Sequence, residues 1–480
     1  MNKNNFYIFI LYFLIYFGFS FYQYYETMLD GDLLAVVLPT EPYKKVLADP
    51  LGTSVIFNHE IYNVPNRFFA HWQQYNFFNN VPLWLQVFFD PIVSLFVSAA
   101  ISKLLIHILF IYLLACVGVG SFSLKNKNLW WFAVLIAPLF QAGGPGKIRM
   151  SIISPYITYT YFYSLGVLWV LLFFSPIFIE QFSGKKLKIK KYFVLFSIIM
   201  APIIALNGAI NAPIVIIIGF IYFLYLYSET YGLRIKIPDL KWHRKNLSNS
   251  YTFGVQIAVL LSFYSFYLGT FNAETLVADQ FTLSEMYLKL FKGVAIYFLD
   301  SFGPLIILIA IDINLFLIHK KKLQETKSLL TLGLWLILFV VIYTLLLPLG
   351  GYRAYRPYIV RADTYLPVTL ILIFYFGKTS LVLFQNQKSK IKLVYIPLVL
   401  IFFTVRNIEV SDDGHKERQA MYQLANSKDE VTVLKTPATV VSWYAITKPE
   451  ENKDAVLLLK RLKIVNRDNL FYSTYDPYPH

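Results

Sequence analysis

Residues 91–117 read PIVSLFVSAAISKLLIHILFIYLLACV, a largely apolar run whose basic side chains are Lys103 and His107. An α-helix needs about 20 mainly apolar residues to cross a bilayer, and this run is long enough to do so. Asp90 precedes the run and Pro91 begins it, which is typical of a helix N-cap and first turn. We therefore predict a membrane-spanning helix over 91–117.

The composition of the whole chain supports the same interpretation. Of 480 residues, 57% are hydrophobic, 18% are aromatic and only 15% are charged, whereas soluble domains are about 25% charged. A β-barrel would show short alternating segments instead of long apolar runs. The net charge of +15 comes from basic residues clustered between the runs. Orientation in a membrane explains these clusters, so nucleic acid is not an expected partner.

We predict an all-α polytopic membrane protein with about eleven transmembrane helices. No small-residue cleavage site follows the first apolar run, so this run is expected to remain as an uncleaved helix. The single cysteine, Cys116, excludes an intramolecular disulfide. The predicted spans are 5–23, 91–117, 129–141, 155–179, 192–206, 209–227, 251–268, 293–318, 328–348, 365–384 and 391–405.

The short loops between these runs predict the orientation, because Lys and Arg stay preferentially on the cytoplasmic side. Alternate loops hold nineteen and seven of these residues, so the N-terminus is expected inside and the C-terminus outside. The transmembrane domain is then 1–405, including a first outer segment at 24–90. A small outer α+β domain is expected at 406–480, with strand-like stretches at Val431–Leu434 and Val440–Ala445.

Two carboxylates, Asp30 and Asp32, flank Gly31 at the start of the first outer segment. The glycine lets the backbone turn tightly, so both carboxylates are expected to face one site from a non-helical segment. Such a D-x-D pair can act as a general base, as a metal ligand or as an anchor for sugar hydroxyls. The alternative is a capping turn in a solvated loop, since Asp-Gly is common turn chemistry.

Basic side chains gather in two outer loops, where positive charge is disfavoured. Guanidinium groups bind phosphate bidentately, so these loops are predicted to hold the phosphate of a lipid headgroup. The alternatives are contact with bulk anionic lipid, pairing of Arg361 with Asp363, and an ordinary tight connection in the glycine-rich loop. The predicted phosphate ligands are Arg353, Arg356 and Arg361 of the loop 349–364, with Lys147 and Arg149 of the loop 142–154.

Four further residues are candidates for lining the same outer cavity: Lys103, His107, His59 and Glu60. Lys103 and His107 lie four residues apart, hence on one face of a helix, and ionisable groups inside a span need partners or water. Their alternatives are a snorkelling lysine and a histidine that is hydrogen-bonded to an adjacent helix. The spacing from His59 to His71 matches no zinc signature, which favours a solvated or interfacial role.

The chain resembles the GT-C class of polytopic membrane glycosyltransferases in the order of its parts. These are a first span, an outer segment opening with Asp30-Gly31-Asp32, further spans and a terminal outer domain. The resemblance covers the whole chain as a topology, and its specific motif is the acidic pair. It implies transfer of a hexosyl or pentosyl unit from a polyprenyl phosphate on the non-cytoplasmic side, with inversion at the anomeric centre. It also implies that Asp30 or Asp32 is the catalytic carboxylate and that the arginine loop holds the donor phosphate.

The chain lacks a W-W-D-type motif and its terminal domain is small, so protein N-glycosylation is not expected. The expected partners are a polyprenyl-phosphate sugar donor, a glycan or lipid acceptor, and membrane lipids. A D-x-D pair can act with or without a divalent ion, which makes Mg²⁺ or Mn²⁺ the candidate cofactors. The abundance of Phe and Tyr, 43 and 36 residues, with that of Ile and Lys, is typical of an AT-rich bacterial genome. We therefore expect a bacterial inner membrane, an outward-facing site and surface-polysaccharide synthesis.

Three other functions fit the same sequence. A polysaccharide polymerase or ligase would use the outer-loop arginines and need no acidic pair. A lipid or glycan transporter would use Lys103 and His107 to line a path. A non-enzymatic assembly subunit would dock a partner through its tail at 406–480.

Overall fold

The structure is a computed structural model that describes residues 3–140, 152–183, 191–208, 210–231, 250–276, 281–300, 302–352, 356–386, 392–435, 439–444 and 446–474. The described chain is mostly helical, with one small sheet. Eight helical segments in it are long and apolar enough to cross a membrane. The predicted class, a helical membrane protein, is confirmed, while eleven spans and their orientation stay predictions.

Six of these segments are single helices, one joins a helix to a short 3-10 turn, and one joins three helical pieces. The helices are α1 (Lys3–Tyr25), α6 (Pro91–Val119), α8 (Ile157–Tyr159) continuing through η2 (Thr160–Ser164) into α9 (Leu165–Ser183), α11 (Asn211–Tyr231), α13 (Ser250–Gly269), α16 (Gly303–Lys320), α17 (Thr326–Leu346) with η4 (Leu347–Gly350), and α18 (Leu366–Gln385). Three shorter apolar helices coincide with shorter predicted runs: α7 (Lys127–Ile136) with η1 (Ala137–Leu139), α10 (Lys191–Ala205) and α19 (Lys392–Arg406).

The predicted span 293–318 is wrong as a single helix. Helix α15 (Leu283–Asp300) begins earlier and ends at Asp300, and α16 starts anew at Gly303 with a proline in its first turn. Proline is suited to a helix start because the first turn needs no backbone N–H bond there. Helix α15 buries Leu290, Gly293 and Tyr297 on one face, and Leu288, Phe291 and Leu299 are exposed.

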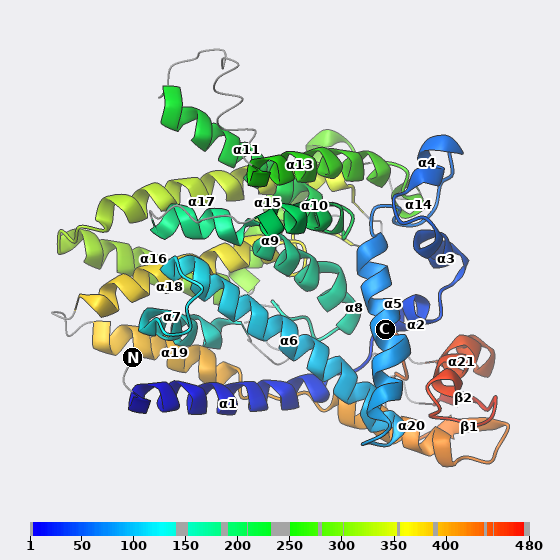
Figure 1. The fold of residues 1–480 in the computed structure, drawn as a ribbon. Helices are drawn as coiled ribbons and strands as arrows, with labels where there is room; N and C mark the ends of the chain where they lie inside the picture. The colour runs from blue at the N-terminus through cyan, green and yellow to red at the C-terminus, as the bar shows by residue number, and fades with distance from the viewer. Residues whose placement is uncertain are drawn as a thin grey trace.

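Helix α6 lies at the centre of the fold and contacts α1, α5, α7, α9 and α18. Its predicted N-cap is confirmed, because the Asp90 carboxylate accepts bonds from the backbone N–H groups of Ile92 and Val93, with Pro91 as the first helical residue. Figure 1 shows α6 running beside α1, with both helices reaching the same end of the bundle.

The segment between α1 and α6 gathers at that end of the bundle. It forms α2 (Gly31–Val37), α3 (Glu41–Ala48), α4 (Thr53–Phe57) and α5 (Phe68–Leu85). In Figure 1, α5 runs across the ends of the spanning helices, close to α14 (Ala273–Leu276) at its upper end.

The C-terminal residues form α20 (Asp413–Asn426), β1 (Val431–Leu434), η5 (Pro449–Asn452), α21 (Lys453–Arg461) and β2 (Leu470–Ser473). The two strands are parallel, with Val431 opposite Leu470. The predicted strand Val431–Leu434 is confirmed. The predicted strand Val440–Ala445 is wrong over its described part, 440–444. Val441 has φ +49, which breaks the extended conformation.

The C-terminal unit packs on the chain just after α1. Arg418 of α20 forms a buried ion pair with Glu26 at 2.8 Å, and the Gly414 N–H donates to the Glu26 carbonyl at 2.9 Å. A Cβ on Gly414 would lie 2.6 Å from the Glu26 carbonyl carbon, so only glycine allows this approach. The chain segment after α1 and the tail therefore pack against each other at one end of the bundle.

Candidate functional site

Asp30 is a buried structural residue. It caps α2, and its two carboxylate oxygens accept bonds from the backbone N–H of Leu33 at 3.1 Å and of Thr158 at 2.9 Å. Burial raises the pKa of the Asp30 carboxyl, and the two Thr158 hydrogen bonds and the Lys103 charge partly oppose that rise. The carboxylate therefore ties α2 to α8 and does not face open solvent.

Asp32 lies in the first turn of α2 and lines an open cavity. Its Oδ1 accepts a bond from the indole Nε1 of Trp443 at 3.0 Å. A Cβ on Gly31 would lie 2.7 Å from Trp443 Cδ1 and 2.9 Å from Trp443 N, so glycine is needed for this approach. The expectation that both carboxylates face one site from a non-helical segment is wrong, because helix capping turns Asp30 inward.

The cavity has a volume of about 510 Å³ and combines acidic, basic and aromatic side chains. Its charged residues come from α2, the start of α5, α14 and the loop before α18. The described lining residues are Asp32, Tyr43, Val64, Arg67, His71, Tyr159, Phe162, Tyr163, Glu274, Arg356, Trp443 and Tyr444. Asp32 and Arg356, which are far apart in the sequence, thus line the same cavity.

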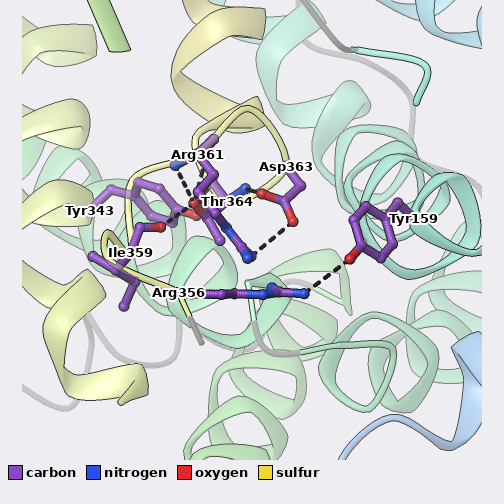
Figure 2. A network of polar contacts seen from close by, with 7 residues as sticks. All are labelled: Tyr159, Tyr343, Arg356, Ile359, Arg361, Asp363 and Thr364. Atoms are coloured by element: carbon purple, nitrogen blue, oxygen red, sulfur yellow. Dashed lines mark hydrogen bonds and ion pairs between the residues drawn. The ribbon is translucent and has the colours of Figure 1, made fainter. Parts of the chain in front are cut away.

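Arg356 reaches the cavity from the loop before α18. Its Nη2 donates to the Tyr159 hydroxyl at 3.0 Å, as Figure 2 shows. Tyr159 is followed by a π-helical turn, Thr160–Ser164, which places Phe162 and Tyr163 on the cavity wall. Single π-helical turns inside α-helices are frequent at functional sites.

Arg361 belongs to the anchored part of the same loop. It pairs with Asp363 at 2.9 Å, so the alternative of an Arg361–Asp363 pair is confirmed. Thr364 donates to the Ile359 carbonyl at 2.5 Å, and Tyr343 donates to the Thr364 carbonyl at 2.7 Å (Figure 2). These bonds hold the loop against α17 and α18.

A second cavity of about 250 Å³ adjoins the first and shares Arg67, Tyr163 and Arg356 with it. Its wall is largely apolar and includes Leu346, Leu347 and Leu349, with Arg361 among its polar residues. The two arginines common to both cavities therefore stand at the junction between a polar space and an apolar one.

Arg67 and His71 line the cavity together, which the sequence analysis did not predict. They lie four residues apart at the start of α5, hence on one helix face. Arg67 Nε is buried without a hydrogen-bond partner among the described residues, and so is His71 Nε2. The available signal was their spacing beside aromatic residues in the first outer segment.

Several predicted candidates lie elsewhere. Lys103 Nζ donates to Thr27 Oγ1 at 2.8 Å and to the Pro155 carbonyl at 2.5 Å, behind the Asp30 cap. His107 is hydrogen-bonded through its two ring nitrogens to Tyr16 at 3.1 Å and Tyr24 at 3.0 Å of α1. The alternative of a histidine bonded to an adjacent helix is therefore confirmed.

Neither of these residues lines the described cavity wall, and neither do His59 and Glu60. Glu60 pairs with Lys45 at 2.9 Å on an exposed surface. The remaining phosphate candidates, Lys147, Arg149 and Arg353, lie outside the described residues.

The acidic pair does not fit a shared metal site. Both Asp30 oxygens are taken up by backbone N–H groups, which leaves Asp32 as the carboxylate of the pair that faces the cavity. Over the described ranges, no three His, Cys, Asp or Glu side chains gather in a way that could hold a metal ion.

Two residues with positive φ lie on or near the cavity wall. Val64, on the cavity wall, has φ +49, and Val441, two residues before Trp443, has the same value. A β-branched residue with positive φ costs about 1–3 kcal/mol and persists only where the surrounding structure enforces it. Such strain is often found at functional sites.

Comparison of the chain with protein-family models, curated proteins and solved structures finds no match to any of them. The class of protein is therefore described from its fold and its cavity. It is a helical membrane protein with an acid- and arginine-lined cavity at one end of its bundle.

Proposed function

We propose that the chain is a membrane glycosyltransferase, which moves a hexosyl or pentosyl unit from a polyprenyl-phosphate donor to a glycan or lipid acceptor. The observation that carries this proposal is that Asp32 and Arg356 line one cavity. A carboxylate can take a proton from an acceptor hydroxyl, while a guanidinium stabilises a leaving phosphate. The proposed setting is a bacterial inner membrane, with the cavity on its outer face.

The two adjoining cavities suit the two ends of such a donor. The apolar wall at Leu346, Leu347 and Leu349 would receive the isoprenoid chain. Arg67 and Arg356, common to both cavities, would bind the phosphate by charge-assisted hydrogen bonds. The sugar would then occupy the larger cavity beside Asp32.

In the proposed step, the acceptor hydroxyl oxygen forms a bond to the anomeric carbon of the sugar. The bond from that carbon to the donor phosphate oxygen breaks, and its electron pair leaves with the phosphate. The hydroxyl proton passes to the Asp32 carboxylate, while Arg67 and Arg356 neutralise the added negative charge on the phosphate. Aromatic neighbours such as Tyr159 and Trp443 would exclude water from the reacting atoms.

Sugar transfer by the full-length protein in lipid vesicles tests the proposal. The probes are labelled polyprenyl-phosphate hexoses and pentoses, with extracted bacterial envelope glycans and lipids as acceptors. We expect conversion by the wild type, loss of conversion in Asp32→Asn, and wild-type conversion in Asp468→Asn, which alters an exposed carboxylate paired with Lys460. No conversion by the wild type, with translocation of the labelled lipid across the vesicle, would overturn the proposal in favour of transport.

The polymerase or ligase alternative makes a different demand on the same cavity. It relies on Arg356 and Arg361 and has no need of a carboxylate. Wild-type conversion in both Asp30→Asn and Asp32→Asn would select this alternative. The transporter alternative receives no support from Lys103 and His107, because both are buried and bonded to neighbouring chain segments.

A further inference from the structure

His71 is held in a single orientation on the cavity wall. The residue is 1% exposed, and its ring lies between Tyr43 and Phe162, with ring centroids 5.1 Å and 4.6 Å away. Nδ1 lies 2.9 Å from the Arg67 carbonyl oxygen. A carbonyl oxygen can only accept, so Nδ1 carries the proton, and in the neutral ring Nε2 presents a lone pair.

The ring is neutral over the physiological pH range. Burial, opposed by the Arg67 carbonyl bond and aided by the Arg67 charge, lowers the pKa of His71 to about 4. His71 therefore offers an acceptor at Nε2, while the neighbouring Arg67 can only donate. The two residues present opposite hydrogen-bonding character to one cavity.

The acceptor at Nε2 has no partner among the described residues, although it is buried. Buried polar atoms are almost always paired in native proteins, so an orphan on the wall of a cavity calls for a ligand with a donor group. The cavity is also lined by Asp32, which the proposed function places beside the sugar. A sugar hydroxyl is a donor of the required kind.

We propose that His71 Nε2 accepts a hydrogen bond from one hydroxyl of the bound sugar, which makes His71 a specificity-determining residue. This inference rests on the proposed function and assigns a role within the same cavity. A site built to bond a hydroxyl discriminates strongly against an analogue that lacks it, because the buried acceptor is then left unpaired. We therefore expect that replacing the hydroxyl that bonds Nε2 with hydrogen weakens binding of the sugar.

The test compares binding of farnesyl-phosphoryl hexoses and pentoses with binding of their monodeoxy analogues, using full-length protein in detergent. In the wild type, removal of one particular hydroxyl should weaken binding about tenfold or more. In His71→Phe, which keeps the ring between Tyr43 and Phe162, the parent and that analogue should bind equally. His71→Gln, whose amide oxygen can replace the acceptor, should restore part of the discrimination and serves if the Phe variant does not fold.

His107→Phe is the matched control, because it removes a buried histidine whose partners Tyr16 and Tyr24 lie away from the cavity. It should keep the full wild-type discrimination. Equal discrimination in the wild type and in both His71 variants would overturn the role of His71, since a water would then satisfy Nε2. Failure of every parent hexose and every parent pentose to bind the wild type would instead reject the proposed function, and this inference with it.

Discussion

The indole Nε1 of Trp443 donates a hydrogen bond to the Asp32 carboxylate at 3.0 Å, so the C-terminal unit supplies part of the cavity that α2 begins. The Trp443 ring also packs edge-on against Tyr156, with centroids 4.9 Å apart. The tail therefore contributes to the wall of the cavity. An isolated transmembrane domain would leave Asp32 without this donor and the cavity without one wall.

A methyl group at Gly31 should disturb this relationship. In Gly31→Ala the new Cβ would meet Trp443 Cδ1 at 2.7 Å and the Trp443 backbone N at 2.9 Å, so the tail must shift. We expect a loss of about 1–3 kcal/mol in the free energy of unfolding, together with reduced sugar transfer. Gly18→Ala is the matched control, because nothing lies within 4 Å of its Cβ. Equal activity of the two variants would show that Trp443 has no part in the reaction.

Substitution of Asp32 should affect sugar transfer, whereas substitution of Asp30 should affect the stability of the fold. Asp32→Asn should reduce sugar transfer about 10²–10⁴-fold with little change in thermal stability, since its carboxylate faces the cavity. Asp30→Asn should lower the free energy of unfolding by about 1–3 kcal/mol, because an amide can accept only one of the two backbone N–H bonds. Turnover and melting temperature, measured on both variants, check this division. The reverse pattern would make Asp30 the reacting group.

The arginines at the junction of the cavities should control donor affinity. Arg67→Gln and Arg356→Gln should each weaken binding of farnesyl phosphate about tenfold to a hundredfold, because each removes a charge-assisted hydrogen bond. Arg406→Gln, at the end of α19, provides a control for lost charge alone. Titration of farnesyl phosphate against each variant measures the effect. Unchanged affinity in both junction variants would place the phosphate elsewhere.

Glu417 should make the docking of the tail dependent on pH. Its carboxyl bonds the backbone N–H of Leu29 and of Val441, next to Asp30 and near Trp443. Burial raises the Glu417 pKa to about 8, the two N–H bonds and Arg418 oppose the rise, and Asp30 adds to it. Neutral Glu417 makes its full contribution to the free energy of unfolding below pH 4.5, the ordinary pKa of a glutamate. That contribution is lost as pH rises through about 8, the pKa of Glu417 in the folded protein.

The melting temperature, measured from about pH 5 to about pH 9, reports this loss of stability. It should fall towards high pH in the wild type, and Glu417→Gln should show a flatter profile because the amide does not titrate. Glu450→Gln, at an exposed position of η5, should keep the wild-type slope. A parallel fall in wild type and Glu417→Gln would contradict this assignment.

The helices were predictable from the sequence because long apolar runs have one stable form in a bilayer. The division between α15 and α16 was missed because the break is short and apolar residues lie on both sides of it. Asp300 and Ser301, followed by Gly303 and Pro304, mark the break in the sequence. The strand at 440–445 failed because Val441 adopts positive φ to place its N–H on Glu417. That conformation depends on a contact with α20, which no local pattern contains.

The candidate site was predictable in part. Asp32 and Arg356 were named from loop position and charge, and the structure brings both to one cavity. The different environments of Asp30 and Asp32 were not predictable, because the Thr158 N–H that turns Asp30 inward comes from a distant helix. Arg67 and His71 carry no motif, and their importance follows from the packing of α5 across the bundle.

The most direct test of the account is the structure of the protein bound to a non-hydrolysable polyprenyl-phosphonate hexose. We expect the phosphonate between Arg67 and Arg356, the isoprenoid chain against Leu346 and Leu347, and the anomeric carbon beside the Asp32 carboxylate. A ligand bound with its sugar outside the cavity, or with its phosphonate away from both arginines, would contradict the claim that these residues act on one donor.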